Sequence, residues 1–167
     1  VCATIKTVTP ANGFVNDLSD YTDEAGVERP RVFRGIDEFG QNHPLPLVSV
    51  LEDPSPLHLT MGGGGTVVGA GDWGLVIQGF VPDDFDHPTD PAHLLAAEVL
   101  SVLARSLNDP LNRLGMGPAQ RGKGHVLGGE LTRPVVRPAD GNVSSVAFFY
   151  MPITLRMVEN LAEPFNS

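Results

Sequence analysis

The sequence is poor in several features that define large classes of protein. It has one cysteine, Cys2, so neither an intrachain disulfide nor a cysteine-based zinc site can form. This usage fits a protein made in a reducing cytoplasm. No apolar run approaches the roughly 18 to 20 residues that a membrane-spanning helix needs, and no signal peptide is visible. Because the chain begins at Val1 and not at methionine, we expect its start to be missing.

Basic residues are also scarce. Lysine and arginine number 11 against 20 aspartates and glutamates, and the net charge is −9. This balance disfavours partners that need a basic surface, such as bound DNA or an anionic membrane. An acidic surface still suits a channel through which DNA slides, because repulsion from the phosphates prevents the binding that lysines and arginines would give. The charge therefore fits both a plain soluble protein and the lining of a DNA conduit.

The sequence lacks the motifs that would indicate an enzyme. Residues 69–74 match G-x-G-x-x-G, but a strand is expected after them, whereas dinucleotide binding requires a helix there. No phosphate-binding P-loop is present. The five histidines lack the spacing of metal ligands on a helix, and no serine lies in G-x-S-x-G. We therefore predict no enzymatic activity, no cofactor and no metal.

Glycine and proline are abundant, at 19 and 15 residues. Such frequent breakers favour short strands and turns over a helical bundle. The length of 167 residues fits one domain with a core of its own. We predict a single domain over residues 1–167, with flexible loops near 57–72 and 111–124.

Apolar periodicity predicts the order of the elements. The pattern of residues 90–108 is that of an amphipathic helix, with Asp90 or Thr89 as N-cap, Pro91 in the first turn and a stop near Pro110. Trp73–Val81 carries apolar residues on both faces and is expected to be a central strand. The other expected strands cover residues 31–35, 45–52, 125–127, 131–137 and 145–159. We predict an α+β fold, with a mixed, largely antiparallel sheet and one main amphipathic helix packed on it.

Four stretches, Val32–Gly35, Leu45–Asp53, Trp73–Phe80 and His87–Ala92, follow one another in a recognisable plan. A proline-led strand ends in an acidic turn, a variable loop follows, and a strand of the type W-x-L-x-I-x-G leads to a helix that begins with P-T-D-P-A. This plan, over roughly residues 30–107, resembles tail-terminator (tail-completion) proteins of long-tailed phages and related neck-ring minor tail proteins. The first 13 residues depart from the family, which usually opens with a clear helix.

The resemblance implies a structural protein of the virion, assembled in the host cytoplasm. Members of the family form a hexameric ring at the head-proximal end of the tail tube, stop its growth and present a surface to the neck. The implied partners are further copies of the chain, the tail-tube protein and the head–neck connector proteins. DNA passes through the channel without specific binding.

Ring contacts need complementary faces on identical subunits. As interface candidates we consider Arg121 and Lys123, which are expected to pair with Asp83, Asp84 and Asp86 of a neighbour. The alternative for those aspartates is an ordinary solvated acidic loop. Trp73 is expected in the core, with an interface anchor as the alternative.

Two other functions remain open from the sequence. One is another ring or sheath subunit of the tail or of head completion, with a related domain. The other is a small enzyme that uses histidine and aspartate groups. The mass of the purified chain in solution separates rings from a strict monomer.

Overall fold

The computed structural model of the chain describes residues 1–40, 43–54, 59–61, 68–115, 125–138 and 145–160. Its helices are α1 (Cys2–Ile5) and α2 (Asp90–Asn108), with short 3-10 turns η1 (Pro10–Asn12) and η2 (Arg113–Gly115). Its strands are β1 (Tyr21–Thr22), β2 (Glu28–Arg29), β3 (Val32–Arg34), β4 (Leu47–Glu52), β5 (Leu59–Met61), β6 (Val68–Pro82), β7 (His125–Leu131), β8 (Val135–Arg137) and β9 (Val146–Asn160).

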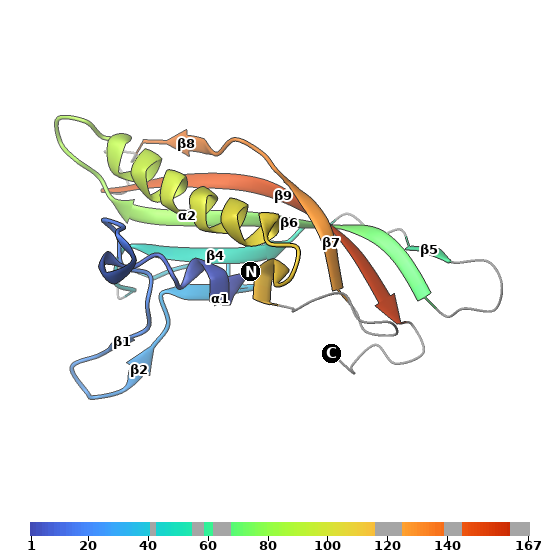
Figure 1. Cartoon of the computed structure of the whole chain (residues 1–167). Coiled ribbons are helices and arrows are strands. Elements are labelled where there is room, and N and C mark those ends of the chain that lie inside the picture. The colour runs from blue at the N-terminus through green and yellow to red at the C-terminus, as the bar shows by residue number, and fades with distance from the viewer. Residues whose placement is uncertain (41–42, 55–58, 62–67, 116–124, 139–144, 161–167) are drawn as a thin grey trace.

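The main sheet has seven strands, and its central path runs β3-β4-β6-β9-β7. The β3–β4 pair is parallel and the other pairs are antiparallel. β5 lies beside β6, and β8 lies beside β9. The predicted α+β class, with a mixed sheet and one main helix, is confirmed (Figure 1).

Helix α2 forms where its sequence predicts. Thr89 occupies the N-cap position, Pro91 lies in the first turn, and the helix ends at Asn108 before Asp109 and Pro110. Its buried side chains recur at helical spacing and form the stripe that packs on the sheet. They are Ala92, Leu95, Ala96, Val99, Val102, Leu103 and Leu107, and Glu98 is buried outside this stripe, against residues 15 and 16.

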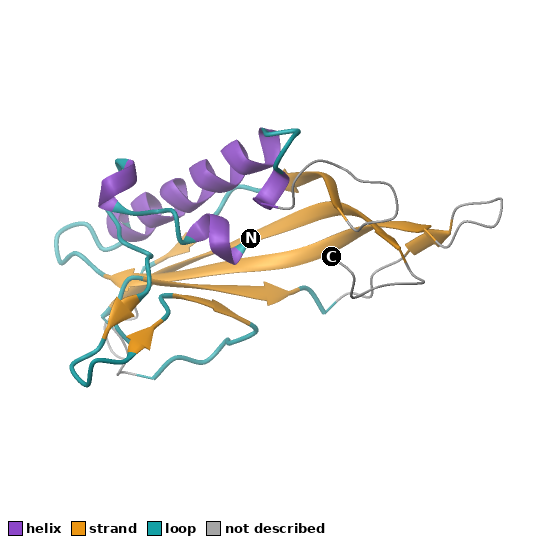
Figure 2. Ribbon diagram, turned by 60° about the horizontal axis from the view of Figure 1, so that its bottom comes forward, coloured by secondary structure: helices purple, strands orange, loops and turns teal. Residues whose placement is uncertain are grey.

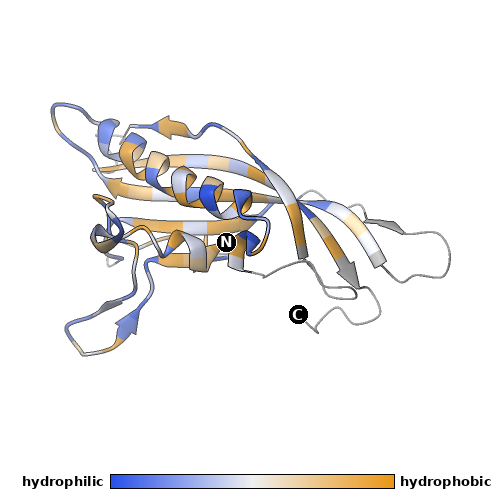
Figure 3. Cartoon of the chain, in the orientation of Figure 1, coloured by the Kyte–Doolittle hydropathy of each residue, from blue (hydrophilic) through white to orange (hydrophobic). Residues whose placement is uncertain are grey.

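The two faces of the sheet differ. Alternate residues of β6 and β9, such as Leu75, Ile77, Phe149 and Met151, are fully or almost fully buried in one core with α2. Figure 2 shows both helices on this side of the sheet, and Figure 3 shows hydrophobic residues along the strands that α2 covers. The side chains between them point to the opposite face, which we call the outer face.

β6 and β9 are much longer than the helix requires. They pair over 15 residues each, from Val68 opposite Asn160 to Pro82 opposite Val146, which is about 50 Å of strand against about 28 Å of helix. Together with β7 they run past the end of α2 and curve away (Figure 1). We call this projection, residues 68–72 and 156–160 with the strands beside them, the arm.

Three boundaries differ from the sequence-based expectation. The prediction of a loop over 57–72 is wrong in two places, because residues 59–61 form β5 and residues 68–72 begin β6. Residues 55–58 and 62–67 lie outside the described part of the chain. Residues 125–131 form one strand, β7, and only 135–137 of the next expected strand pair with β9. Of the expected loop over 111–124, the described part contains η2. The glycines of β6 pair with residues of β9, and this pairing outweighs the low strand propensity of glycine.

Candidate functional site

The outer face of the sheet carries an apolar surface. Phe80 lies opposite Phe148 in register, and their rings stack with centroids 6.1 Å apart. Val76 and Tyr150 lie further along the two strands on the same face, where the polar Gln78, opposite Tyr150, stands between Val76 and Phe80. Each of the four apolar side chains keeps part of its area exposed. We call the set Val76, Phe80, Val135, Phe148, Tyr150 and Pro152 the outer-face patch.

One end of this face is covered by the chain itself. The segment after β3 returns over β4, where the Ser49 hydroxyl donates to the Ile36 carbonyl. Phe39 then packs edge-on against Phe33, with centroids 5.1 Å apart, and in a tilted arrangement against Phe80, with centroids 5.5 Å apart. Beyond Phe80, towards β9 and β8, the described segments leave the patch partly open to solvent.

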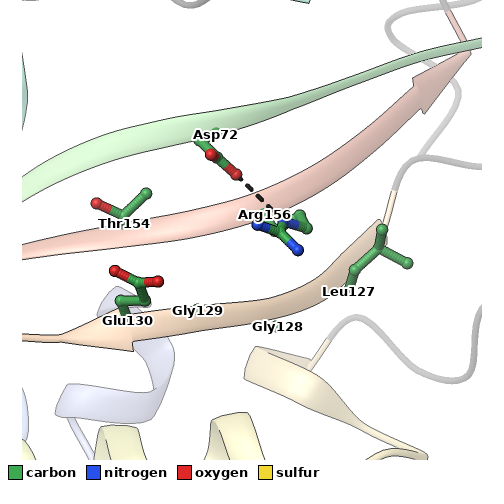
Figure 4. Close-up of a pocket in the computed structure, with 7 residues that line it drawn as sticks. All are labelled: Asp72, Leu127, Gly128, Gly129, Glu130, Thr154 and Arg156. Carbon is green, nitrogen blue, oxygen red and sulfur yellow. Dashed lines mark hydrogen bonds and ion pairs between the residues drawn. The ribbon is translucent and has the colours of Figure 1, made fainter. Parts of the chain in front are cut away.

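Further along the outer face, on the arm, lies a shallow polar hollow of about 360 Å³ (Figure 4). Asp72 and Arg156 are cross-strand partners whose carboxylate and guanidinium lie 3.4 Å apart. Glu130 and Thr154 border the same hollow, and Gly128 faces Arg156 without a side chain. The ion pair is more than half exposed, so water screens it.

The described residues that line this hollow include no histidine, cysteine or serine. Within the described residues, no group of three histidine, cysteine or acidic side chains is placed to hold a metal ion. No helix in the described part of the chain is long and apolar enough to cross a membrane.

The predicted acidic residues lie in the loop between β6 and α2. The Asp83 amide donates to the Ser145 carbonyl at 3.0 Å, and an Asp84 carboxylate oxygen accepts the amides of Asp86 and His87, each at 2.9 Å. These amide hydrogen bonds, from His87 first and Asp86 next, lower the pKa of Asp84 below its ordinary 3.8, and the charge of His87 adds to them. The Asp83 amide and the Asp84 carboxylate therefore fix the conformation of the loop.

Of the other predicted interface residues, Trp73 lies within the described part of the chain, and it is not near this loop. Trp73 lies near the opposite end of β6, opposite Leu155, and packs half-buried against the core. Its position agrees with the expected core role. Arg121 and Lys123 lie outside the described residues, so their pairing with the acidic loop stays a prediction.

The sequence reasoning missed the residue at the tip of that loop. Phe85 is 98% exposed, although phenylalanine is usually buried. The only signal was an aromatic residue among aspartates, and the acidic character of residues 83–87 concealed it.

Comparison with known proteins adds little. No family model matches the chain, and no curated protein matches it. Among solved structures, the chain is similar to a component of a structure described as the virion of a native gene transfer agent particle. That similarity has a TM-score of 0.45 and 15% identity, and it covers 77% of this chain and 78% of the other.

Proposed function

We propose that the chain is a structural subunit of a virion, a ring-forming protein that caps the head-proximal end of a phage tail tube. In this role it joins the tube to the neck and lets DNA pass. The observation that carries the proposal is the outer-face patch, an apolar sheet surface that the described part of the chain leaves partly open.

An apolar sheet face needs a cover. Contiguous exposed apolar surface on a soluble protein marks a site of association, because water is released when a partner covers it. The stacked Phe80 and Phe148 rings and the Tyr150 side chain are the kind of residues that dominate interface energies. A partner protein therefore fits this face better than a small molecule.

The arm supports the same role. An antiparallel pair of about 50 Å reaches well beyond the core, and its length is not needed to bury α2. A projecting pair of strands suits contact with a neighbouring subunit, since it adds surface without enlarging the core. The tail-terminator assignment itself comes from the resemblance of residues 30–107.

The charge is compatible with a DNA conduit. A net charge of −9 repels phosphates, so DNA moves past such a surface without the counterion release that holds it on basic proteins. We accordingly propose no specific DNA contact.

A capping assay tests the proposal. The tail-tube protein of the same virion is assembled with and without the full chain, and tube lengths are measured by electron microscopy. We expect the chain to bind one end of each tube and to shorten the length distribution. Tubes of unchanged length with bare ends would overturn the capping role.

A matched pair of variants ties the assay to the patch. Val135→Lys places a charge on the patch at a side chain that is 37% exposed, and Val27→Lys makes the same change at 45% exposure on the β1–β2 turn. We expect Val135→Lys to weaken assembly and Val27→Lys to leave it unchanged. Equal behaviour of the two variants would remove the patch from the interface.

A further inference from the structure

The two ends of α2 carry unlike surfaces. Of the eight large hydrophobic residues that the described part of the chain exposes, four lie at these ends. Phe85, Val15 and Leu94 lie at the N-terminal end, and Leu111 follows the C-terminal end.

The N-terminal end presents a knob. Phe85 projects from a loop that is tied to Ser145 on one side and, through the amide of Asp90 on the carbonyl of His87, to the start of α2 on the other. The Asp84 carboxylate fixes the turn between these ties. Because the loop is already ordered, burying Phe85 in a partner requires little further loss of backbone freedom.

The C-terminal end presents a groove. It lies between α1, the segment around Phe14, the last two turns of α2 and η2, and its volume is about 610 Å³. Phe14, Val102 and Leu114 give it an apolar floor. The groove is wide and open to solvent, so a side chain that projects from another molecule can reach its floor.

The N-terminal end is acidic, and the groove carries one charge of each sign. Asp83, Asp84 and Asp86 lie on either side of Phe85 in the loop, whereas Arg105 lines the groove with its guanidinium 5.9 Å from the Phe14 ring centroid. Asp109 also lines the groove, and its carboxylate accepts the amide of Leu111 at 2.9 Å. Arg105 is therefore the cation of the groove that an aspartate of the loop can pair with.

Phe85 cannot reach the groove of its own chain. Phe85 precedes the first residue of α2, and Arg105 lies near the last, so more than about 20 Å of helix separates them. Figure 1 shows the β6–α2 loop and η2 at opposite ends of the helix. A knob and a groove at opposite ends make a head-to-tail contact between copies, which closes into a ring when the rotation per subunit divides the circle.

We propose that Phe85 of one copy inserts into the groove between α1, α2 and η2 of a second copy. Leu111 beside that groove then faces the hollow between Val15 and Leu94 of the first copy. This contact specifies how neighbouring subunits of the proposed ring bind each other, so it rests on the proposed function. It places the ring contact on a surface other than the outer-face patch.

The test uses two full-length variants with one defect each. Phe85→Ser removes the knob and keeps the groove, and Ala3→Trp fills the groove at an exposed residue of its wall and keeps the knob. Leu127→Ser, at an exposed leucine of β7, is the control. Circular dichroism and thermal melts establish that all three fold as the wild type does.

Sedimentation and native mass spectrometry then report self-association. We expect each of the two defective chains alone to associate at least about thirty-fold more weakly than the wild type, as for a central aromatic anchor. Their equimolar mixture should form a dimer and no larger species, because it contains one working knob and one working groove per pair. Leu127→Ser should associate as the wild type does.

Three outcomes overturn the proposal. Wild-type self-association of Phe85→Ser, or absence of the dimer in the mixture, removes this contact while leaving the proposed virion role to the capping assay. A wild-type chain that stays monomeric at every soluble concentration also removes it, and binding to tube ends then decides the virion role separately.

Discussion

Replacing Glu98 by alanine should destabilise the fold more than any other single change on α2 outside its apolar stripe. Glu98 is 7% exposed, and its carboxylate accepts the Val15 amide at 2.6 Å, the Asn16 amide at 3.2 Å and the Asn16 side-chain amide at 2.7 Å. These bonds attach residues 14–16, which precede the first strands, to the middle of the helix.

The magnitude follows from the two short bonds. A hydrogen bond to a charged group contributes about 1.5 kcal/mol at the lower end of the measured range, so the loss of two gives about 3 kcal/mol. The third bond, from the Asn16 backbone amide at 3.2 Å, adds little. Asn16 is only half-buried, so water can accept a hydrogen bond from this amide when the carboxylate is removed. In a domain of this size the melting temperature should fall by about 6 to 12 °C.

Urea unfolding followed by circular dichroism measures the change, with the slope of the transition as a check on two-state behaviour. Glu98→Gln keeps one acceptor oxygen and should lose about half as much stability as Glu98→Ala. His93→Ala, at an exposed position of the same helix, is the control. A loss under about 1 kcal/mol for Glu98→Ala would refute the argument that this carboxylate holds the N-terminal segment.

Three further changes have definite expected results. Gly79→Ala places a methyl group against the Phe149 ring, far inside van der Waals contact, and should lower the free energy of unfolding by about 1 to 3 kcal/mol. Phe149→Leu in the same chain should recover part of that loss, and additive losses in urea unfolding would contradict the clash. The pKa of Asp84 should lie below 3.8, so its contribution to loop order is present above that pH and lost as the pH falls through the lowered pKa; a carboxyl NMR titration with its midpoint at or above 3.8 would exclude this. Arg156→Ala should change the free energy of unfolding by less than about 1 kcal/mol, because its pairing with Asp72 is more than half exposed; a larger loss in a urea melt would show that the arm depends on the pair.

The helix and the long strands could be predicted because their periodicity agrees with their final environment. Residues 90–108 combine a proline start, a buried stripe and an Asn-Asp-Pro stop, so local and tertiary signals coincide. Within Val146–Asn160, residues 153–157 alternate apolar and polar residues, and the apolar run before them suits a strand with neighbours on both sides.

The first part of β6 and the knob could not be predicted in this way. Gly69 to Asp72 look like a loop by composition, and only pairing with β9 makes them a strand. Apolar residues on both faces of β6 correctly indicated a central position in the sheet. They do not reveal that the Val76 and Phe80 side chains remain partly exposed. Likewise the exposure of Phe85 depends on how the Asp84 turn aims the loop, which periodicity does not encode.

The central claim is that this chain builds a closed ring in a virion. Native mass spectrometry of the full-length chain over a range of concentrations, followed by imaging of the largest species, tests it most directly. The account predicts one discrete oligomer that grows at the expense of the 17.8 kDa monomer and appears as a ring with an open centre. A mass of 17.8 kDa at every concentration, with or without tail tubes present, would contradict it.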